Sequence, residues 1–453
     1  MSIALMVATS IVTGLAIRLL RRWPRLVFAA VLIGAAGLSA ILFAAPSTPL
    51  GLFGRTLMLD AHARTFLWLA VGAAVALALF GLLTFEPADD SPAAIIANSQ
   101  GAFFFWSLAP LVLAIGLDSF PLAVFFWALG LIVLMLLATP RREGRVGGAA
   151  QFLLLTVIAS ASLLLANRFS DLYPLTLENT DLIRNAVIFL ALGLGLLLAV
   201  VPLHIWLGPL ADEMPPLGTA FLVGVAQPVG LWLLFQLMSR TLWLTDKSPL
   251  LSVLIFGGGL TVPVGALLAL SERRDGRFIA YLSLVSLGHA LIGLGLGTRL
   301  GLAGAMLETF NRAIGVALVA GGLAFARHHL ERRWQLIGAG AILVGGVTLA
   351  GIPPALGFAA RWTIYRDLAG TNLPLVALLL AGSAATLFAT LRVAALLLIG
   401  QAEPVKTEEV KIVPYLCAVV AVILLAIVLI GGFSPQLITD PLVAAFAQAN
   451  YLK

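Results

Sequence analysis

Long apolar segments recur along almost the whole chain of 453 residues, and they constrain the fold more than any other feature. A helix that crosses about 30 Å of hydrocarbon needs about 20 mostly apolar residues. About fourteen stretches meet this requirement, near residues 2–20, 26–45, 64–85, 97–117, 119–139, 148–167, 185–206, 217–239, 249–271, 278–298, 301–326, 335–368, 373–400 and 412–432. The sequence therefore predicts an all-α polytopic membrane protein.

The composition supports this class: 61% of the residues are hydrophobic and only 11% are charged. Soluble chains contain about 45–50% apolar and about 25% charged residues. Soluble catalytic domains, zinc modules and nucleic-acid binding are therefore disfavoured. The formal charge of +6 comes from arginine-rich loops, which suit an anionic membrane face. The single cysteine, Cys417, is expected to pack as a small hydrophobe.

The loops differ in their basic residues, and this difference predicts an orientation. Fifteen lysines and arginines lie in the loops after odd-numbered spans, and nine lie in the other loops and at the ends. We therefore expect the odd loops in the cytoplasm and both termini on the outer, positive side of the cell inner membrane or another energy-coupling membrane. The chain starts with an apolar segment that has no cationic leader, so we expect a retained first helix.

Few titratable residues remain at membrane depth: Glu308, Arg312, Arg361, Arg392, His204 and His289. A charge at the bilayer centre costs about 2.5–3.5 kcal/mol or more, so each must face protein or water and find a partner. Glu308 and Arg312 are four residues apart on one predicted helix. They form either a self-neutralised pair that permits insertion or one link of a buried charge relay.

The other candidates also have two interpretations. Arg361 follows a predicted helix break by seven residues, and it either reaches towards the membrane surface or serves a functional site inside the broken helix. Arg392, near the middle of its span, is either functional or a bridge between helices. His289 is either a satisfied core histidine or a titrating group.

Two spans contain proline interruptions. The first is Val201-Pro202-Leu203-His204, and the second is Gly351-Ile352-Pro353-Pro354. Because the segments are five spans apart, they enter the membrane from opposite sides, as in inverted repeats with an ion path near the midplane. The alternative is two ordinary proline kinks. The predicted organisation is three N-terminal helices (1–95), two inverted five-helix repeats (96–240 and 241–400) with helices 7 and 12 broken, and a C-terminal helix and tail (401–453).

Four segments together resemble the antiporter-like subunits of respiratory complex I, the Mrp cation/proton antiporters and the membrane-bound hydrogenases, closest to the N-type subunit of NADH-quinone oxidoreductase. They are Pro202-Leu203-His204-Ile205-Trp206, with Pro215 eleven residues after the histidine; Arg277 to Ser283, leading into Leu287-Gly288; Gly351 to Phe358; and the Arg361 that follows. Asn311-Arg312-Ala313 is similar to a motif of the M-type and Mrp branch. The resemblance covers residues 95–400.

The resemblance implies a central axis of buried glutamate, lysine and histidine residues that relay protons. The chain departs from this pattern. The family's lysine positions fall on Leu197, Gln227 and Val316, its glutamate on Trp127 or Ala128, and its usual histidine on Ser286. Only Arg361 keeps a cation, and arginine stays charged in proteins. The expected residues of a partial proton path are His204, Gln227, His289, Glu308, Arg312, Arg361 and Arg392.

Three functions remain open: an antiporter-like membrane-arm subunit of a complex I-like assembly with a partial or degenerate proton path, a subunit of an Mrp-type antiporter or membrane-bound hydrogenase, or a non-conducting scaffold. We expect no catalysis, metal or cofactor in this chain; quinone, flavin and iron–sulfur groups are expected only in partner subunits. The expected partners are other membrane subunits, the lipid bilayer, and protons or sodium as transported ions, with no nucleic acid.

Overall fold

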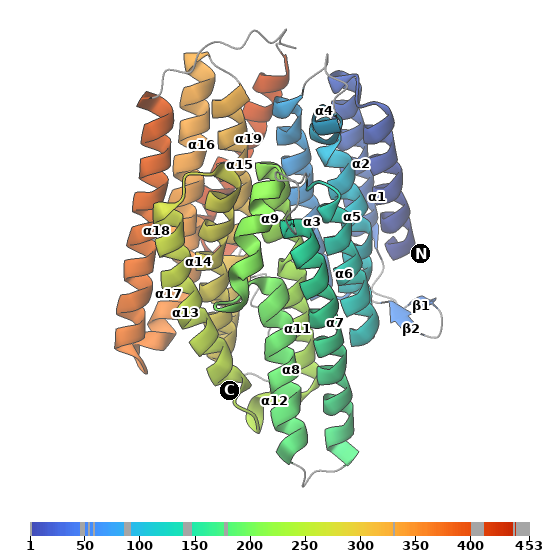
Figure 1. Ribbon diagram of the computed structural model, residues 1–453, viewed down its shortest axis with the longest axis vertical. Coiled ribbons are helices and arrows are strands. Elements are labelled where there is room, and N and C mark those ends of the chain that lie inside the picture. Colours follow the sequence, from blue (N-terminus) through green and yellow to red (C-terminus); the bar gives the residue numbers. More distant parts are fainter. Residues whose placement is uncertain are drawn as a thin grey trace.

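The computed structural model describes residues 2–45, 50–52, 55–57, 59–85, 92–138, 147–175, 180–328, 331–399, 412–437 and 440. The described chain forms one bundle of roughly parallel and antiparallel helices (Figure 1). The N-terminal half contains α1 (Ser2–Leu19), α2 (Pro24–Ala44), the short strands β1 (Leu50–Leu52) and β2 (Arg55–Leu57), α3 (Ala61–Phe80), α4 (Pro92–Ala97), α5 (Gln100–Gly116), α6 (Phe120–Met135), α7 (Gly148–Leu172), α8 (Thr180–Leu198), α9 (Leu207–Glu213), α10 (Pro216–Phe221), α11 (Pro228–Arg240) and α12 (Leu242–Asp246). The C-terminal half contains α13 (Leu250–Ser271), α14 (Asp275–Gly295), α15 (Arg299–His328), α16 (Arg332–Ala350), α17 (Leu356–Ala369), α18 (Leu373–Ile399) and α19 (Ile412–Phe433).

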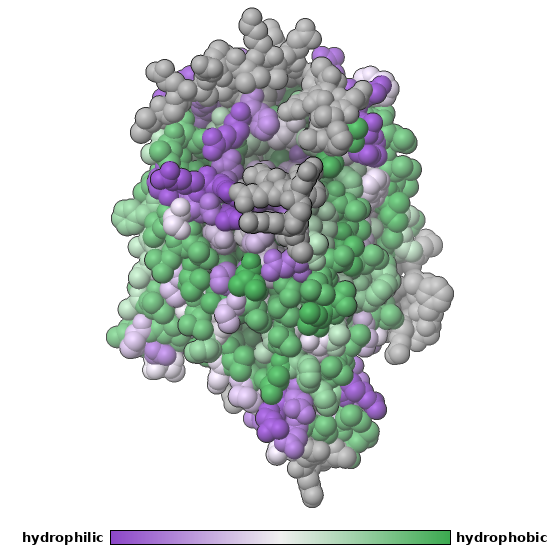
Figure 2. Space-filling model, viewed as in Figure 1, coloured by the Kyte–Doolittle hydropathy of each residue, from purple (hydrophilic) through white to green (hydrophobic). Residues whose placement is uncertain are grey.

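Hydrophobic residues cover the middle of the bundle, and hydrophilic residues gather near its ends (Figure 2). Within the described residues, twelve helices are long and apolar enough to cross a membrane, and α5 and α6 are shorter apolar helices. Every range that the sequence predicts to span the membrane contains either one helix or shorter helix pieces in the structure. The all-α polytopic class is confirmed, whereas the count of fourteen crossings stays a prediction. Of the described residues, only those of the β1–β2 hairpin form strands.

Three segments form the interior of the bundle: α14, α15 and the stretch from α10 to α11. The apolar window of α14 is wholly buried, whereas α2 and α19 expose large hydrophobic side chains, as lipid-facing helices do. The start of α15 is rich in glycine and alanine, which let helix backbones approach closely. The last helix, α19, packs against α3, where the Cys417 thiol lies 3.2 Å from the Leu79 carbonyl oxygen. Cys417 is buried, as expected.

Both predicted breaks are present. The helix α8 ends at Leu198, the left-handed residue Ala199 follows, and the short helical turn η3 (Leu203–Trp206) begins after Pro202. The helix α16 ends at Ala350, the left-handed residue Gly351 follows, and α17 begins after Pro353 and Pro354. A Cβ atom on Gly351 would lie 2.4 Å from Cδ of Arg361, so this position requires glycine for space as well as for conformation.

A third irregularity was not predicted. Between α10 and α11 the chain forms the π-helical segment η4 (Leu222–Ala226), directly before Gln227 and Pro228. Proline has no N–H and its ring clashes with the preceding turn, which explains a local widening at this point. The segment directs Gln227 into the interior, where its side chain is fully buried.

Candidate functional site

Among the described residues, the buried charged and histidine side chains other than Asp212 lie on α14, α15 and α17, the second piece of the broken helix 12. At the centre, the Arg361 guanidinium on α17 pairs with the Glu308 carboxylate on α15, with Nη2 3.1 Å from Oε1. Both side chains are 0% exposed. The interpretation of Arg361 as a residue that reaches towards the membrane surface is therefore wrong.

The Arg361 guanidinium also closes the end of α16. Its Nη1 donates to the Ala350 carbonyl at 2.7 Å, and its Nη2 donates to the Leu349 carbonyl. The last carbonyls of a helix lack intrahelical partners and carry partial negative charge, which favours a cation at this place. Arg361 thus joins the broken helix to Glu308.

The second oxygen of Glu308 belongs to a neutral hydrogen-bond chain. Asn311 Nδ2 donates to Oε2 at 3.2 Å and to the Thr348 carbonyl at 3.0 Å. The Thr348 hydroxyl donates to Asn311 Oδ1 at 2.5 Å and accepts from the N–H of Gly357 at 3.2 Å. These bonds connect α15 to both sides of the break, so Glu308 has donors on both carboxylate oxygens.

His289 on α14 connects to the same cluster through Tyr365. Its Nε2 lies 2.9 Å from the Tyr365 hydroxyl, which lies 3.3 Å from Ser383 Oγ. Ser383 accepts from Arg361 Nη1 at 2.6 Å. The ring nitrogen Nδ1 lies 2.8 Å from the Val285 carbonyl of the preceding turn. His289 is therefore both a satisfied core histidine and the end of a hydroxyl chain to Arg361.

Arg312 does not pair with Glu308, so of the two interpretations the self-neutralised pair is wrong. Although the two residues are four apart on α15, Glu308 faces Arg361, and Arg312 Nη2 donates to Gln227 Oε1. Gln227 Nε2 donates in turn to the Leu197 carbonyl at the end of α8, at 3.1 Å. Both Arg312 and Gln227 are buried.

Neutral side chains occupy the positions of the N-terminal half where the family resemblance implies carriers. Leu197 is fully buried in the hydrophobic core, and Trp127 donates its indole N–H to the Ala226 carbonyl at 2.8 Å. In the C-terminal half, Ser286 and Val316 occupy such positions as well, and both are buried. Two of these substitutes, Trp127 and Gln227, satisfy backbone carbonyls freed by η4 and by the broken helix 7.

Two predicted site residues lie outside the network. His204 is half-buried in η3, after the first break, and within the described part of the chain it is not hydrogen-bonded to Glu308 or Arg361. Arg392 on α18 donates to the carbonyls of Ala269 and Glu272 at the end of α13, so it bridges two helices.

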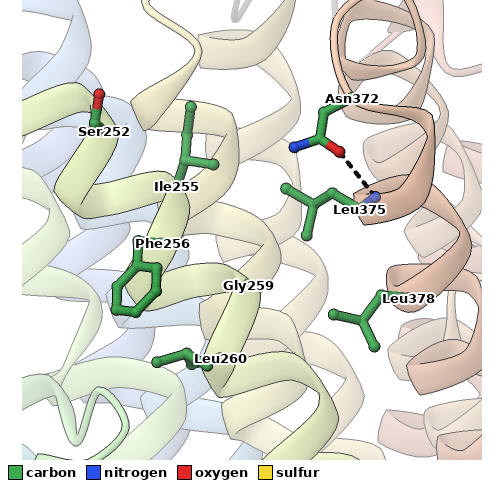
Figure 3. A pocket seen from close by; sticks show the side chains of 8 residues that line it. All are labelled: Ser252, Ile255, Phe256, Gly259, Leu260, Asn372, Leu375 and Leu378. Atoms are coloured by element: carbon green, nitrogen blue, oxygen red, sulfur yellow. Dashed lines mark hydrogen bonds between the residues drawn. The ribbon is translucent and has the colours of Figure 1, made fainter.

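The described residues line two clefts beside α18. The larger, about 660 Å³, lies between α17 and α18; its side chains are mostly apolar, and Tyr365 and Ser383 at its wall belong to the hydrogen-bond chain. The smaller, about 370 Å³, lies between α13 and α18 (Figure 3). In it, Asn372 accepts a hydrogen bond from the N–H of Leu375. No titratable side chain lines this smaller cleft. Because Tyr365 and Ser383 line the larger cleft, the larger of the two is the one that reaches the hydrogen-bond network.

Neutral members of the network were missed from the sequence: Thr348, Tyr365 and Ser383. A search for charges passes over them, but two signals were present. Tyr365 follows Arg361 by one helical turn, and Ser383 interrupts an apolar run. Of the charged and titratable groups in the network, a carboxyl such as that of Glu308 and an imidazole such as that of His289 are able to gain and lose a proton, whereas the guanidiniums stay charged.

Residues 118–389 match the family model described as NADH:quinone oxidoreductase/Mrp antiporter, TM. Over 327 residues the chain is 27% identical to NADH-quinone oxidoreductase subunit N of Desulforudis audaxviator, covering 65% of this chain and 64% of that one. Over 260 residues it is 29% identical to formate hydrogenlyase subunit 3 of Escherichia coli, covering 51% and 42%. Each match thus spans less than two-thirds of the relative.

The fold is similar to that of a chain of respiratory complex I from Thermus thermophilus, with a TM-score of 0.79 over the full length of both chains. The sequence identity in this comparison is 19%, so the likeness concerns the fold. The family match covers more than half of the chain and includes both broken helices and the whole Glu308–Arg361 network.

Proposed function

Because this chain belongs to the NADH:quinone oxidoreductase/Mrp antiporter membrane family, we propose that it serves as an antiporter-like membrane-arm subunit of a complex I-like, proton-translocating assembly. In this role it carries no redox chemistry. Quinone, flavin and iron–sulfur groups belong to partner subunits. Other membrane subunits are its partners.

One observation carries the proposal: beside a broken helix, the buried Glu308 carboxylate pairs with the Arg361 guanidinium, which caps the end of α16 and also binds a chain of hydroxyl groups. Glu308 is held by Arg361 and Asn311, and the route continues through Ser383 and Tyr365 to His289. Carboxyl, hydroxyl and imidazole groups are the parts from which intramembrane proton relays are built. The Arg361 guanidinium lies between Glu308 and Ser383 and stays charged, so it positions these groups and does not carry the proton itself. The proton path of this subunit is therefore confined to its C-terminal half.

The N-terminal half supports the partial character of the path. Leucine and tryptophan cannot carry a proton, and Leu197 and Trp127 fill their positions without exposure. The same observation favours a second candidate, a scaffold subunit that seals the membrane arm and conducts nothing. Membership of an Mrp-type antiporter or a membrane-bound hydrogenase is the alternative assembly, with protons or sodium as the transported ion.

We further propose the cell inner membrane, or another energy-coupling membrane, as the location, with both termini on the positive side. The basic residues of the odd loops support this orientation, because positive loops stay on the cytoplasmic side. Arg274 and Arg277 at the start of α14 pair with Asp212 at the end of α9, so the acidic residue of that loop is neutralised locally.

The assembly is tested by purification of the tagged full-length chain from its own host and identification of the subunits that accompany it. Quinone-reductase subunits are expected. Hydrogenase or Mrp subunits would assign the alternative assembly, and purification without any membrane partner would contradict the proposal.

The partial path is tested in inverted membrane vesicles that contain the complete assembly. Glu308→Gln is expected to lower the number of protons moved per electron, because the carboxyl group of the path is lost. Trp127→Phe is the matched control in the N-terminal half, and it is expected to leave this ratio unchanged. An unchanged ratio in Glu308→Gln, with normal yield of the complex, would identify the chain as a non-conducting scaffold.

A further inference from the structure

Arg312 is buried with most of its donors unused. Its side chain is 1% exposed, and Nη2 donates to Gln227 Oε1. The other two nitrogens, Nε and Nη1, have no acceptor among the described residues. A guanidinium has five N–H donors and stays charged in proteins, so this site has both unused donors and an unmatched charge.

The charge count leads to the same conclusion independently of the donors. The buried network contains two guanidiniums, Arg312 and Arg361, and one carboxylate, Glu308. Asp212, the other carboxylate buried within the described ranges, pairs with Arg274 and Arg277 near the end of the bundle. If Glu308 turned towards Arg312, it would leave Arg361 without a counter-ion. One positive charge therefore stays unmatched in either arrangement.

An unpaired buried charge costs several kcal/mol, which a counter-ion offsets. Because Arg312 is enclosed by its own chain, a side chain of another subunit cannot reach it while the bundle stays closed. A small solute is not subject to this restriction. We propose that Arg312 is the recognition group of a site for a small monovalent inorganic anion of halide size, held inside the bundle at the Nε and Nη1 donors.

Gln227 is the positioning residue of this site. The side-chain N–H of Gln227 donates a hydrogen bond to the Leu197 carbonyl at 3.1 Å. This bond orients the amide group so that the Gln227 oxygen, Oε1, faces Arg312. A neutral amide oxygen accepts a hydrogen bond but leaves the charge of Arg312 uncompensated. A carboxylate at position 227 would compensate it and take the place of the anion.

The site is tested with the full-length chain, purified in detergent with bromide as the only halide. After transfer into gluconate buffer, the protein is denatured and the released bromide is measured by mass spectrometry. Wild type is expected to release about one bromide per chain, since one guanidinium carries one charge. Arg312→Gln is expected to release almost none.

Two further variants keep the test decisive if Arg312→Gln does not fold. Gln227→Glu supplies a fixed carboxylate beside Arg312 and is expected to abolish bromide retention in a folded protein. Arg392→Gln, which changes a half-buried arginine that binds only backbone carbonyls, is expected to retain bromide as wild type does. The proposal is overturned if wild type releases no bromide, or if Gln227→Glu retains as much as wild type. Neither result depends on proton transport.

Discussion

The breaks in helices 7 and 12 expose the same kind of backbone groups, but the side chains that satisfy them differ in charge. At the end of α8, the Leu196 carbonyl accepts from the Trp206 indole at 2.7 Å, and the Leu197 carbonyl accepts from the Gln227 amide at 3.1 Å. At the end of α16, both the Leu349 and Ala350 carbonyls accept from one guanidinium, Arg361.

This difference determines where buried charge accumulates. A neutral donor satisfies a helix end without needing a counter-ion of its own, so Leu197 and Trp127 beside α8 can be uncharged, although Gln227 also accepts a hydrogen bond from the buried Arg312. A cationic donor gains from the helix dipole but needs a carboxylate nearby. Glu308 supplies it, and Asn311, Ser383 and Tyr365 complete the hydrogen bonding. The polar network therefore grows around the charged cap.

The largest expected effect comes from placing a cation at the neutral break. Leu197→Lys puts an ammonium group at a fully buried position, where the cost of removing an unpaired charge from water is several kcal/mol. We expect loss of the folded protein, measured as the monodisperse yield in detergent. Leu197→Met, which keeps size and polarity, is the control and should keep most of the yield. A folded, well-expressed Leu197→Lys variant would show that water reaches the first break.

The second-largest expected effect comes from removing the Arg361 side chain, which caps the end of α16. Arg361→Ala leaves Glu308 buried without its partner and two carbonyls without a donor, a loss of about 3–5 kcal/mol by analogy with broken buried ion pairs. We expect a large fall in the thermal unfolding midpoint and in assembly with other subunits.

Gln227→Ala is the matched change at the neutral break. It removes the donor to the Leu197 carbonyl and the acceptor of the Arg312 guanidinium, for which about 1–3 kcal/mol is expected. The comparison fails if Arg361→Ala assembles and unfolds as wild type does, or if Gln227→Ala is the more damaging of the two variants.

The sequence predicted the class and the broken helices because both depend on local signals. Twenty-residue apolar runs, a proline after a helix and a glycine at its end are visible without tertiary information. The burial of Glu308 followed from its position inside an apolar span, whereas for Arg361 the sequence left burial and a reach towards the membrane surface both open.

The pairing of these charges did not follow from the sequence. Spacing on one helix favoured Glu308 with Arg312, yet the chain folds so that Arg361, 53 residues later, takes the carboxylate. The free carbonyls of α16 hold the Arg361 guanidinium in place, and those carbonyls exist only after helix 12 breaks beside α15. The π segment η4 and the neutral members Thr348 and Ser383 depend on tertiary contacts in the same way.

The smallest expected effect compares one hydroxyl at each break. At the first break, Thr261 Oγ1 accepts from the N–H of Val201 at 3.1 Å, a bond between neutral groups. At the second, Ser383 Oγ accepts from the charged Arg361 Nη1 at 2.6 Å. Hydrogen bonds to charged groups contribute about 1.5–3 kcal/mol, and neutral ones about 0.5–1.5 kcal/mol. Ser383→Ala should therefore lower the thermal unfolding midpoint more than Thr261→Val. An equal or larger shift in Thr261→Val would mean that the charge of the cap adds nothing to the second break.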